Sequence, residues 1–240
     1  MKTIFAGIKN ATFFRGLKLL SAVTDYLVTE FIFKSKVAHQ KQFEHWNHSQ
    51  ERVDRRLERS PDRPDLWSRV IEKSEGSNGL SKDEHYSNAS LFMIAGTETT
   101  ATALSGTTYY LLQNPAVMAE LTKEIRSNFA DFDALDLDQL ARQKYLMAVL
   151  QEGLRMYPPF PTSLPRIVPD GGMEIDGKFV PAGTAIGMHH LATYRMESYF
   201  KNANEFHPER WLGDPAYKDD HLNAMEPFSV GPRNCLGKSQ

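Results

Sequence analysis

The feature that most constrains this chain is a short segment near its C-terminus, residues 228–237, which contains the only cysteine in the sequence. Cys235 follows Arg233 by two residues and Phe228 by seven, and Gly231 and Gly237 flank it on either side. A thiolate is a strong ligand for a soft or borderline metal. A haem iron needs only one protein ligand, because the porphyrin supplies four nitrogens. One cysteine is therefore compatible with haem and not with a four-ligand zinc site.

The neighbours of Cys235 have physical roles in such a site. Gly231 permits a tight backbone approach or a positive φ, and Gly237 leaves space where the chain must lie against a flat ring. Arg233 can pair with an anionic propionate, and Phe228 can shield the sulfur from water. Backbone amides at a helix start just after Cys235 would stabilise a thiolate. The alternative is a buried, inert thiol, which the cysteine alone favours.

Length, composition and charge indicate an ordinary folded protein and argue against several other classes. The chain has 240 residues, enough for one large domain or two small ones, and its 41% hydrophobic and 24% charged residues are ordinary for a folded protein. The net charge of −2 gives no attraction to nucleic acid, and one cysteine excludes a disulfide framework. We expect no transmembrane segment, because the most apolar candidate, residues 19–33, is short and contains Asp25 and Glu30.

The first part of the chain predicts helices. We expect helical segments within residues 1–33, a helix from about Lys34 that stops before Pro61 and Pro64, and a short helix over 65–73 that stops near Gly76. The next helix is the longest, since Ser81 and Glu84 match a capping box and no stop signal follows before Asn114–Pro115. Another helix then starts at Pro115 with Asn114 as its cap, followed by one over 142–156.

After Pro161 the pattern changes to strands. Asp176–Gly177 between two alternating segments predicts a hairpin over 173–180, and an apolar stretch follows at 184–188. His189 and His190, if on a strand, would point to opposite sides, so we interpret them as packing or surface residues rather than a metal pair. From Tyr199 to Phe228 we expect an irregular meander.

The middle of the long helix carries unusual residues for a helix interior. Ala95–Gly96–Thr97–Glu98–Thr99–Thr100 places a glycine, three threonines and an acid inside an apolar run. Such a departure from helix propensity often marks a functional site. The alternative is a structural turn in which the hydroxyls bond back to carbonyls of the preceding turn, and from this segment alone the two remain open.

Four motifs in order resemble those of one family. The A-G-x-E-T helix is followed by E-x-x-R at Glu152 and Arg155, by P-E-R-W containing Arg210, and by F-x-x-G-x-R-x-C-x-G around Cys235. The pair Glu152 and Arg155 alone is weak evidence, but this order is similar to that of the cytochrome P450 monooxygenases. The resemblance implies a mainly α fold with a small β hairpin or sheet region. That partial cytochrome P450 fold comprises a long central helix, the E-x-x-R helix, a meander and the cysteine haem loop.

The resemblance implies a role for each matching residue. Cys235 would be the axial thiolate of haem, with Phe228, Gly231, Arg233 and Gly237 around it. Glu152, Arg155 and Arg210 would form a buried ion network that locks the meander under the haem, and Arg166 would be a second propionate partner. Thr162, Ser163 and Leu164 would face the substrate cavity. On the long helix, Ala95 and Gly96 would leave space for dioxygen, Thr99 would hydrogen-bond the bound oxygen, and Glu98 would relay protons.

The implied activity is insertion of one oxygen atom of O2 into a C–H bond of a small lipophilic substrate, with NADPH-derived electrons supplied by a reductase. The chain most resembles fungal microsomal hydroxylases of secondary metabolism, which implies the cytosolic face of the endoplasmic reticulum membrane. We expect residues 1–240 to form a single, incomplete P450 domain, without the N-terminal anchor and sheet or the helix after the cysteine. One alternative is a catalytically inactive haem-binding or interaction fragment. Another is a redox-silent haem-thiolate isomerase or dehydratase, which the presence of Glu98 and Thr99 disfavours.

Overall fold

The computed structural model describes residues 36–59, 65, 67, 68, 70, 71 and 79–239. The chain divides into two compact units, residues 1–98 and 99–240, and each is described by itself. The helical segments expected within 1–33, and the helix stops expected at Pro61, Pro64 and Gly76, lie outside the described residues.

In the first unit, helix α3 (Lys36–Leu57) packs against the beginning of α5 (Lys82–Gln113). The Tyr86 hydroxyl donates to Asp54 Oδ1 at 2.8 Å, and Lys82 forms an ion pair with the same carboxylate at 3.0 Å. The capping box is confirmed, because Ser81 N donates to Glu84 Oε2 at 2.8 Å while Glu84 N donates to Ser81 Oγ at 3.4 Å. Local chemistry therefore sets where α5 begins.

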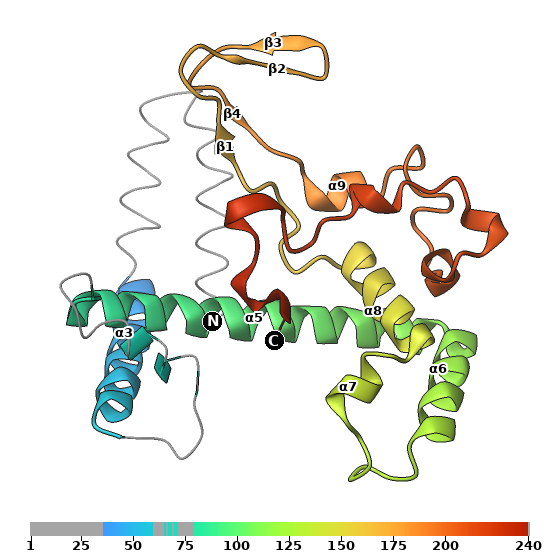
Figure 1. Cartoon of the computed structure of the whole chain (residues 1–240), viewed down its shortest axis with the longest axis horizontal. Coiled ribbons are helices and arrows are strands. Elements are labelled where there is room, and N and C mark those ends of the chain that lie inside the picture. Colours follow the sequence, from blue (N-terminus) through green and yellow to red (C-terminus); the bar gives the residue numbers. More distant parts are fainter. Residues whose placement is uncertain (1–35, 60–64, 66, 69, 72–78, 240) are drawn as a thin grey trace. The chain divides into compact units, whose positions relative to one another are not determined.

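Helix α5 is the longest helix among the described residues, with 32 residues, as the sequence predicts (Figure 1). It stays α-helical through Gly96 and the threonines, so the residues with poor helix propensity cause no break. At about 1.5 Å per residue its length is roughly 48 Å. The helix ends at Gln113, and the next helix starts at Pro115 after Asn114.

The second unit continues with α6 (Pro115–Asn128), α7 (Leu137–Leu140) and α8 (Lys144–Met156). Figure 1 shows α6 and α8 near the C-terminal end of α5. Pro115 starts α6 and Asn114 is its N-cap residue, both as predicted, but the Asn114 side chain makes no capping bond. Asn114 Nδ2 donates instead to Tyr110 O at 2.8 Å and so closes the end of α5. A buried cluster of Val149, Met156 and Phe206 joins these helices to the following loops.

The strands form two antiparallel pairs. Strand β2 (Met173–Ile175) pairs with β3 (Lys178–Val180), and Asp176 and Gly177 between them have φ of 50° and 70°. Two positive φ values are what a type I′ turn requires, so the predicted hairpin is confirmed. Strand β1 (Arg166–Ile167) pairs with β4 (Ala185–Ile186).

His189 and His190 do not lie on a strand, and that expectation is wrong. His190 begins helix α9 (His190–Tyr194), and His189 is its N-cap, whose Nδ1 accepts from Ala192 N at 3.3 Å. A histidine ring nitrogen here takes the place of the usual capping oxygen. The His190 ring stacks on Tyr194, 5.5 Å between centroids, so it is a packing residue.

The meander predicted from Tyr199 to Phe228 is present as an irregular segment with three short 3₁₀ helices, η2 (Pro208–Leu212), η3 (Pro215–Tyr217) and η4 (Leu222–Ala224). Two more, η5 (Gly231–Arg233) and η6 (Leu236–Ser239), follow it in the cysteine loop. A buried hydrophobic cluster forms the core beneath the meander, made of Tyr194, Phe200, Ala203 and Met225. The described part of the second unit is thus mainly helical with small antiparallel strand pairs.

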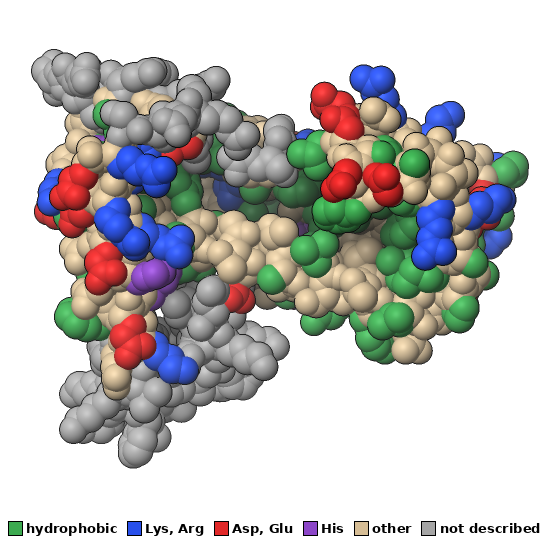
Figure 2. All heavy atoms as spheres, turned by 90° about the horizontal axis from the view of Figure 1, so that it is seen from below, with side chains coloured by type: hydrophobic (Ala, Val, Ile, Leu, Met, Phe, Trp, Pro, Cys, Tyr) green, Lys and Arg blue, Asp and Glu red, His purple; other side chains and the backbone are tan. Residues whose placement is uncertain are grey.

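The surface carries many apolar side chains, and they reach solvent in several places on the face that Figure 2 shows. Phe132, in the loop before α7, is 84% exposed, and Leu137, the first residue of α7, is 83% exposed. Within the described ranges, no helix combines the length and the apolar character that crossing a membrane requires.

Candidate functional site

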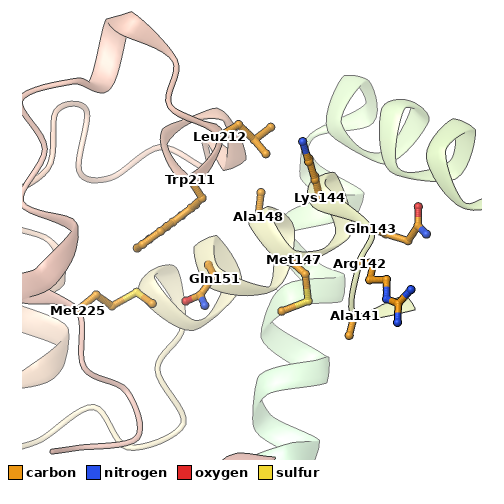
Figure 3. Close-up of a pocket in the computed structure, with 10 residues that line it drawn as sticks. All are labelled: Ala141, Arg142, Gln143, Lys144, Met147, Ala148, Gln151, Trp211, Leu212 and Met225. Carbon is orange, nitrogen blue, oxygen red and sulfur yellow. The ribbon is translucent and has the colours of Figure 1, made fainter. Parts of the chain in front are cut away.

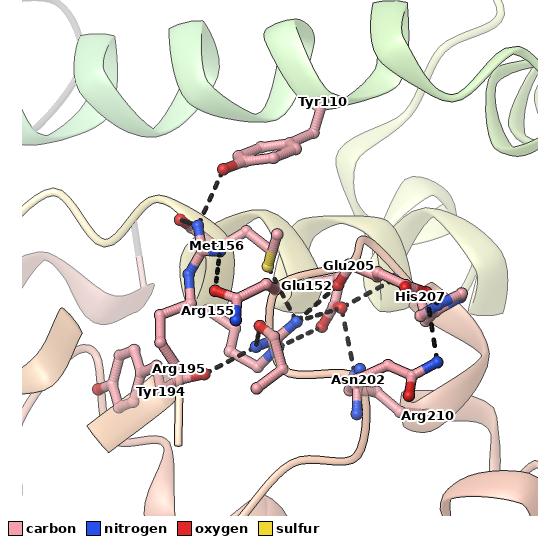
Figure 4. Close-up of polar contacts among 12 residues, drawn as sticks. Tyr110, Glu152, Arg155, Met156, Tyr194, Arg195, Asn202, Glu205, His207 and Arg210 are labelled. Atoms are coloured by element: carbon pink, nitrogen blue, oxygen red, sulfur yellow. Dashed lines mark hydrogen bonds and ion pairs between the residues drawn. The ribbon is translucent and has the colours of Figure 1, made fainter. Parts of the chain in front are cut away.

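The structure brings Glu152, Arg155 and Arg210 together in the interior of the second unit. Glu152 and Arg155 lie three residues apart on α8, and Arg210 comes from η2. Arg155 contacts Glu152 through two bonds, Nη2 to Oε1 at 2.8 Å and Nε to Oε2 at 2.9 Å. Arg210 Nε donates to Glu152 Oε1 at 3.1 Å. All three side chains are buried, with no exposed area on either partner of each ion pair (Figure 4).

Further donors complete the shell of the Glu152 carboxylate. His207 N donates to Oε1 at 2.8 Å, and Trp211 Nε1 donates to Oε2 at 2.9 Å. Burial raises the pKa of the Glu152 carboxyl, but the hydrogen bonds and charge of Arg155, with the charge of Arg210, outweigh burial and hold the pKa below its ordinary value. The lowered pKa favours the ionised form of Glu152, which suits an anchor for the two arginines rather than a proton donor.

The two arginines tie the meander to α8. Arg155 Nη1 donates to the carbonyls of Tyr194 and Ala203, each at 2.7 Å, and Nη2 donates to that of Glu205 at 2.9 Å. Arg210 forms an ion pair with Asp220 and donates to Lys201 O at 3.1 Å. Otherwise unpaired loop carbonyls thus find donors in the interior, which allows an irregular segment to be buried.

Sequence reasoning missed two positioning residues. Arg195 Nη2 donates to Tyr110 OH at 2.9 Å and to Met156 O at 2.6 Å, so it joins the end of α5 to the end of α8 (Figure 4). Glu124 of α6 accepts from the backbone amides of Tyr145 and Leu146, both at 2.9 Å, and so caps α8 from another helix. One signal was available for the second, because Gln143 at the start of α8 is a poor N-cap residue and makes no capping bond.

The cysteine loop is exposed. Cys235 N donates to Phe228 O at 2.8 Å, which closes the loop, and Gly231 has a φ of 75°, the conformation expected of it. The Cys235 side chain is exposed, as are Arg233 and Gly237. Leu236 beside the sulfur is 83% exposed.

The remaining predicted site residues lie on three segments. Arg166 on β1 is exposed and donates to the carbonyls of Leu164 and Pro165. Thr162 and Ser163 are half-buried in the loop before it. On α5, Ala95 and Gly96 are exposed while Glu98 and Thr99 are half-buried, and a Cβ added at Gly96 would meet nothing within 4 Å.

These residues fit haem better than a metal ion held by protein alone. Among the described residues no group of three or more His, Cys, Asp or Glu side chains could hold an ion. A single accessible thiol suits a porphyrin iron, which needs one protein ligand on that side. Exposed guanidinium groups on Arg233 and Arg166 suit anionic propionates.

Fold and site thus define a mainly helical protein with a buried Glu–Arg–Arg network and an exposed cysteine loop. Residues 1–239 match the sequence model of the family described as Cytochrome P450, and the chain belongs to this family. The family implies haem with a cysteine thiolate ligand.

Similar proteins are fungal. The chain is 43% identical over 242 residues to a cytochrome P450 monooxygenase of Hormonema carpetanum, a match that covers 100% of this chain and 47% of the relative. It is 45% identical over 195 residues to a cytochrome P450 monooxygenase of Gibberella moniliformis (81% and 41% covered). It is 44% identical over 190 residues to the averantin hydroxylase of Dothistroma septosporum (79% and 36%). The chain spans about half the length of the relatives it matches.

Proposed function

We propose that this chain is the thiolate-bearing part of a monooxygenase that inserts one atom of O2 into a C–H bond of a small lipophilic substrate. The observation that supports this most strongly is the complete F-x-x-G-x-R-x-C-x-G pattern in a chain that matches the P450 family over residues 1–239. Electrons would come from NADPH through a reductase. A relative that is a hydroxylase supports an oxidative role in fungal secondary metabolism. On the family resemblance alone, we place the protein at the cytosolic face of the endoplasmic reticulum membrane.

Cys235 would hold the haem iron through its thiolate. When bound, haem supplies the chemistry that activates dioxygen. Arg233 and Arg166 would neutralise the propionates, and Phe228 would shield the sulfur from water. The small side chains at Gly231 and Gly237 let the loop lie close to a flat ring, and the network of Glu152, Arg155 and Arg210 would hold the meander behind the loop.

The polar groups that handle protons are assigned to α5 on the family resemblance. Thr99 would hold a proton at Oγ1 and Glu98 would pass protons inward from solvent, while Ala95 and Gly96 leave room for dioxygen. A hydroxyl and a carboxylate in a mostly apolar chamber deliver protons without admitting bulk water. Thr162, Ser163 and Leu164 would contact the substrate.

The thiolate is tested by reconstituting the chain with haem and recording the reduced, carbon-monoxide-bound spectrum. We expect the far red-shifted band of a thiolate-ligated haem in the parent and its loss in Cys235→Ser. An unchanged band in Cys235→Ser would overturn the ligand assignment. Absence of any bound haem in the parent would instead favour an interaction fragment.

The proton path is tested with Thr99→Ala, with a reductase and an oxidisable substrate present. Removing the hydroxyl should leave haem binding intact but divert most of the electrons to peroxide, because a positioned proton donor contributes about 10²–10⁴-fold to the rate of the step it serves. Thr100→Ala, on the next position of the same helix, is the matched control. Equal coupling in Thr99→Ala and the parent would count against this role.

A further inference from the structure

A cavity of about 610 Å³ lies in the second unit between the start of α8 and η2. Its walls come from three segments, the α7–α8 turn, one face of α8 and the meander. The ten residues that line it are Ala141, Arg142, Gln143, Lys144, Met147, Ala148, Gln151, Trp211, Leu212 and Met225. Apart from Trp211, which donates to Glu152 of the ion network, none of these residues has a role in the proposed monooxygenase site. The volume falls in the range of small-molecule sites, roughly 300–1,000 Å³.

The lining is mixed, with Gln151 beside Met225 and Leu212 beside Lys144, but the largest apolar side chains lie away from Arg142 (Figure 3). Figure 3 shows Trp211 and Met225 on one side and Arg142, Gln143 and Lys144 on the other, with Met147 and Ala148 between them. None of the described residues that line the cavity carries a carboxylate. Arg142 and Lys144 are exposed, and within the described ranges neither side chain has an ion pair or hydrogen bond. A wall with two uncompensated cations and an apolar floor favours a ligand of opposite charge with an apolar body.

The start of α8 does not itself supply the anion site. Glu124 already accepts from the amides of Tyr145 and Leu146, so these donors are occupied, and its carboxylate adds a negative charge near that end. An anion in the cavity would have to be recognised by the side chains of Arg142, Lys144 and Gln143. Anion binding in the cavity would therefore depend on these side chains rather than on the N-terminus of α8.

We infer that this cavity binds a small amphipathic carboxylate, an organic acid with a flat apolar body. The body would lie against Trp211, Met225 and Met147, and the carboxylate would face Lys144 and Arg142. This goes beyond the proposed function and needs no haem. A bound ligand would also contact a residue of the ion network, because the Trp211 ring lines the cavity while its Nε1 donates to Glu152.

The test is calorimetric titration of the 240-residue chain with 2-naphthoate in low salt. We expect saturable one-to-one binding that weakens as salt is added. Lys144→Gln and Arg142→Gln should each weaken it about threefold to fivefold, because an exposed ion pair contributes up to about 1 kcal/mol. Met147→Gln should also weaken it, since it replaces an apolar wall with a polar one of similar length.

Two controls make the test specific. Lys178→Gln removes an exposed lysine of the β2–β3 hairpin, outside the cavity, and should leave binding unchanged. The neutral analogue 2-naphthylmethanol should bind more weakly than the acid by a similar factor. Equal affinity for acid and alcohol, or unchanged binding in the Lys144→Gln, Arg142→Gln double variant, would overturn the proposal. So would sedimentation showing a dimer that Met147→Gln dissociates, because the occupant would then be a second copy.

Discussion

The ion network and the cysteine loop are both expected site elements, and the structure builds them in opposite ways. Glu152, Arg155 and Arg210 have no exposed side-chain area in their ion pairs, and Glu152 alone accepts from four different residues. The loop around Cys235 is exposed and is closed by a backbone bond from Cys235 N to Phe228 O. The polar groups of the ion network find all their partners inside the second unit, whereas the cysteine loop presents its side chains to solvent.

The difference indicates that the ion network stabilises the fold, while the cysteine loop is available to bind a ligand. A buried charge must find partners inside the protein, so the network fixes the positions of α8 and the meander whether or not a ligand is present. An exposed thiol and exposed guanidinium groups make few internal contacts and are available to an incoming group. We therefore expect substitutions in the network to affect stability strongly and substitutions in the loop to affect it little.

The largest effect is expected for Arg155→Ala. The variant leaves the buried Glu152 without its bidentate partner and the carbonyls of Tyr194, Ala203 and Glu205 without a donor. It should lose about 3–5 kcal/mol of unfolding free energy in a urea titration followed by circular dichroism. Arg166→Ala, at an exposed arginine, should lose less than about 0.5 kcal/mol. Similar losses in the two variants would contradict the contrast between the regions.

Gly153→Ala tests how closely α8 packs against α5. A Cβ at this position would collide with the Thr107 side chain, which is only 7% exposed. Overpacking of this kind costs about 1–3 kcal/mol. Adding Thr107→Ala should recover most of the loss, and a double-mutant cycle measures that coupling. Additive losses would mean that the two helices do not meet at Gly153.

Glu124→Gln tests the cap that α6 provides to α8. The amide keeps one acceptor oxygen but loses the charge that favours a helix N-terminus, so about 1 kcal/mol of stability should be lost. Glu120→Gln on the same helix removes only an exposed ion pair with Lys123 and should cost less than about 0.5 kcal/mol. Equal melting temperatures for the two variants would argue against a capping role.

Cys235→Ser should have the smallest effect on stability. The side chain is exposed, so its replacement should change the unfolding free energy of the haem-free chain by no more than about 0.5 kcal/mol. Denaturant unfolding without haem is the measurement. A loss above about 2 kcal/mol would show that the sulfur supports the fold and would remove the distinction between the two regions.

Elements set by local chemistry could be predicted well. Ser81 and Glu84 are three residues apart and bond to each other, and Asp176–Gly177 adopts the two positive φ values that its residue types favour. The errors came where a neighbour competed for a side chain. The Asn114 side chain bonds back to Tyr110 O rather than to α6. The apolar stretch at 184–188 does contain strand β4, but the strand does not extend to His189 and His190, where a helix begins.

Sequence alone determined which groups exist, namely the cysteine loop, the E-x-x-R pair, the hairpin turn and the start of the long helix, because each depends on residues close together in the chain. Tertiary structure decided which distant groups meet. Glu124 caps an amide 21 residues away, and Arg195 reaches Tyr110 across 85 residues. No local pattern encodes such contacts, because a buried polar group bonds to whichever partner packing brings within reach. The same packing left the Cys235 loop open to solvent while it enclosed Glu152.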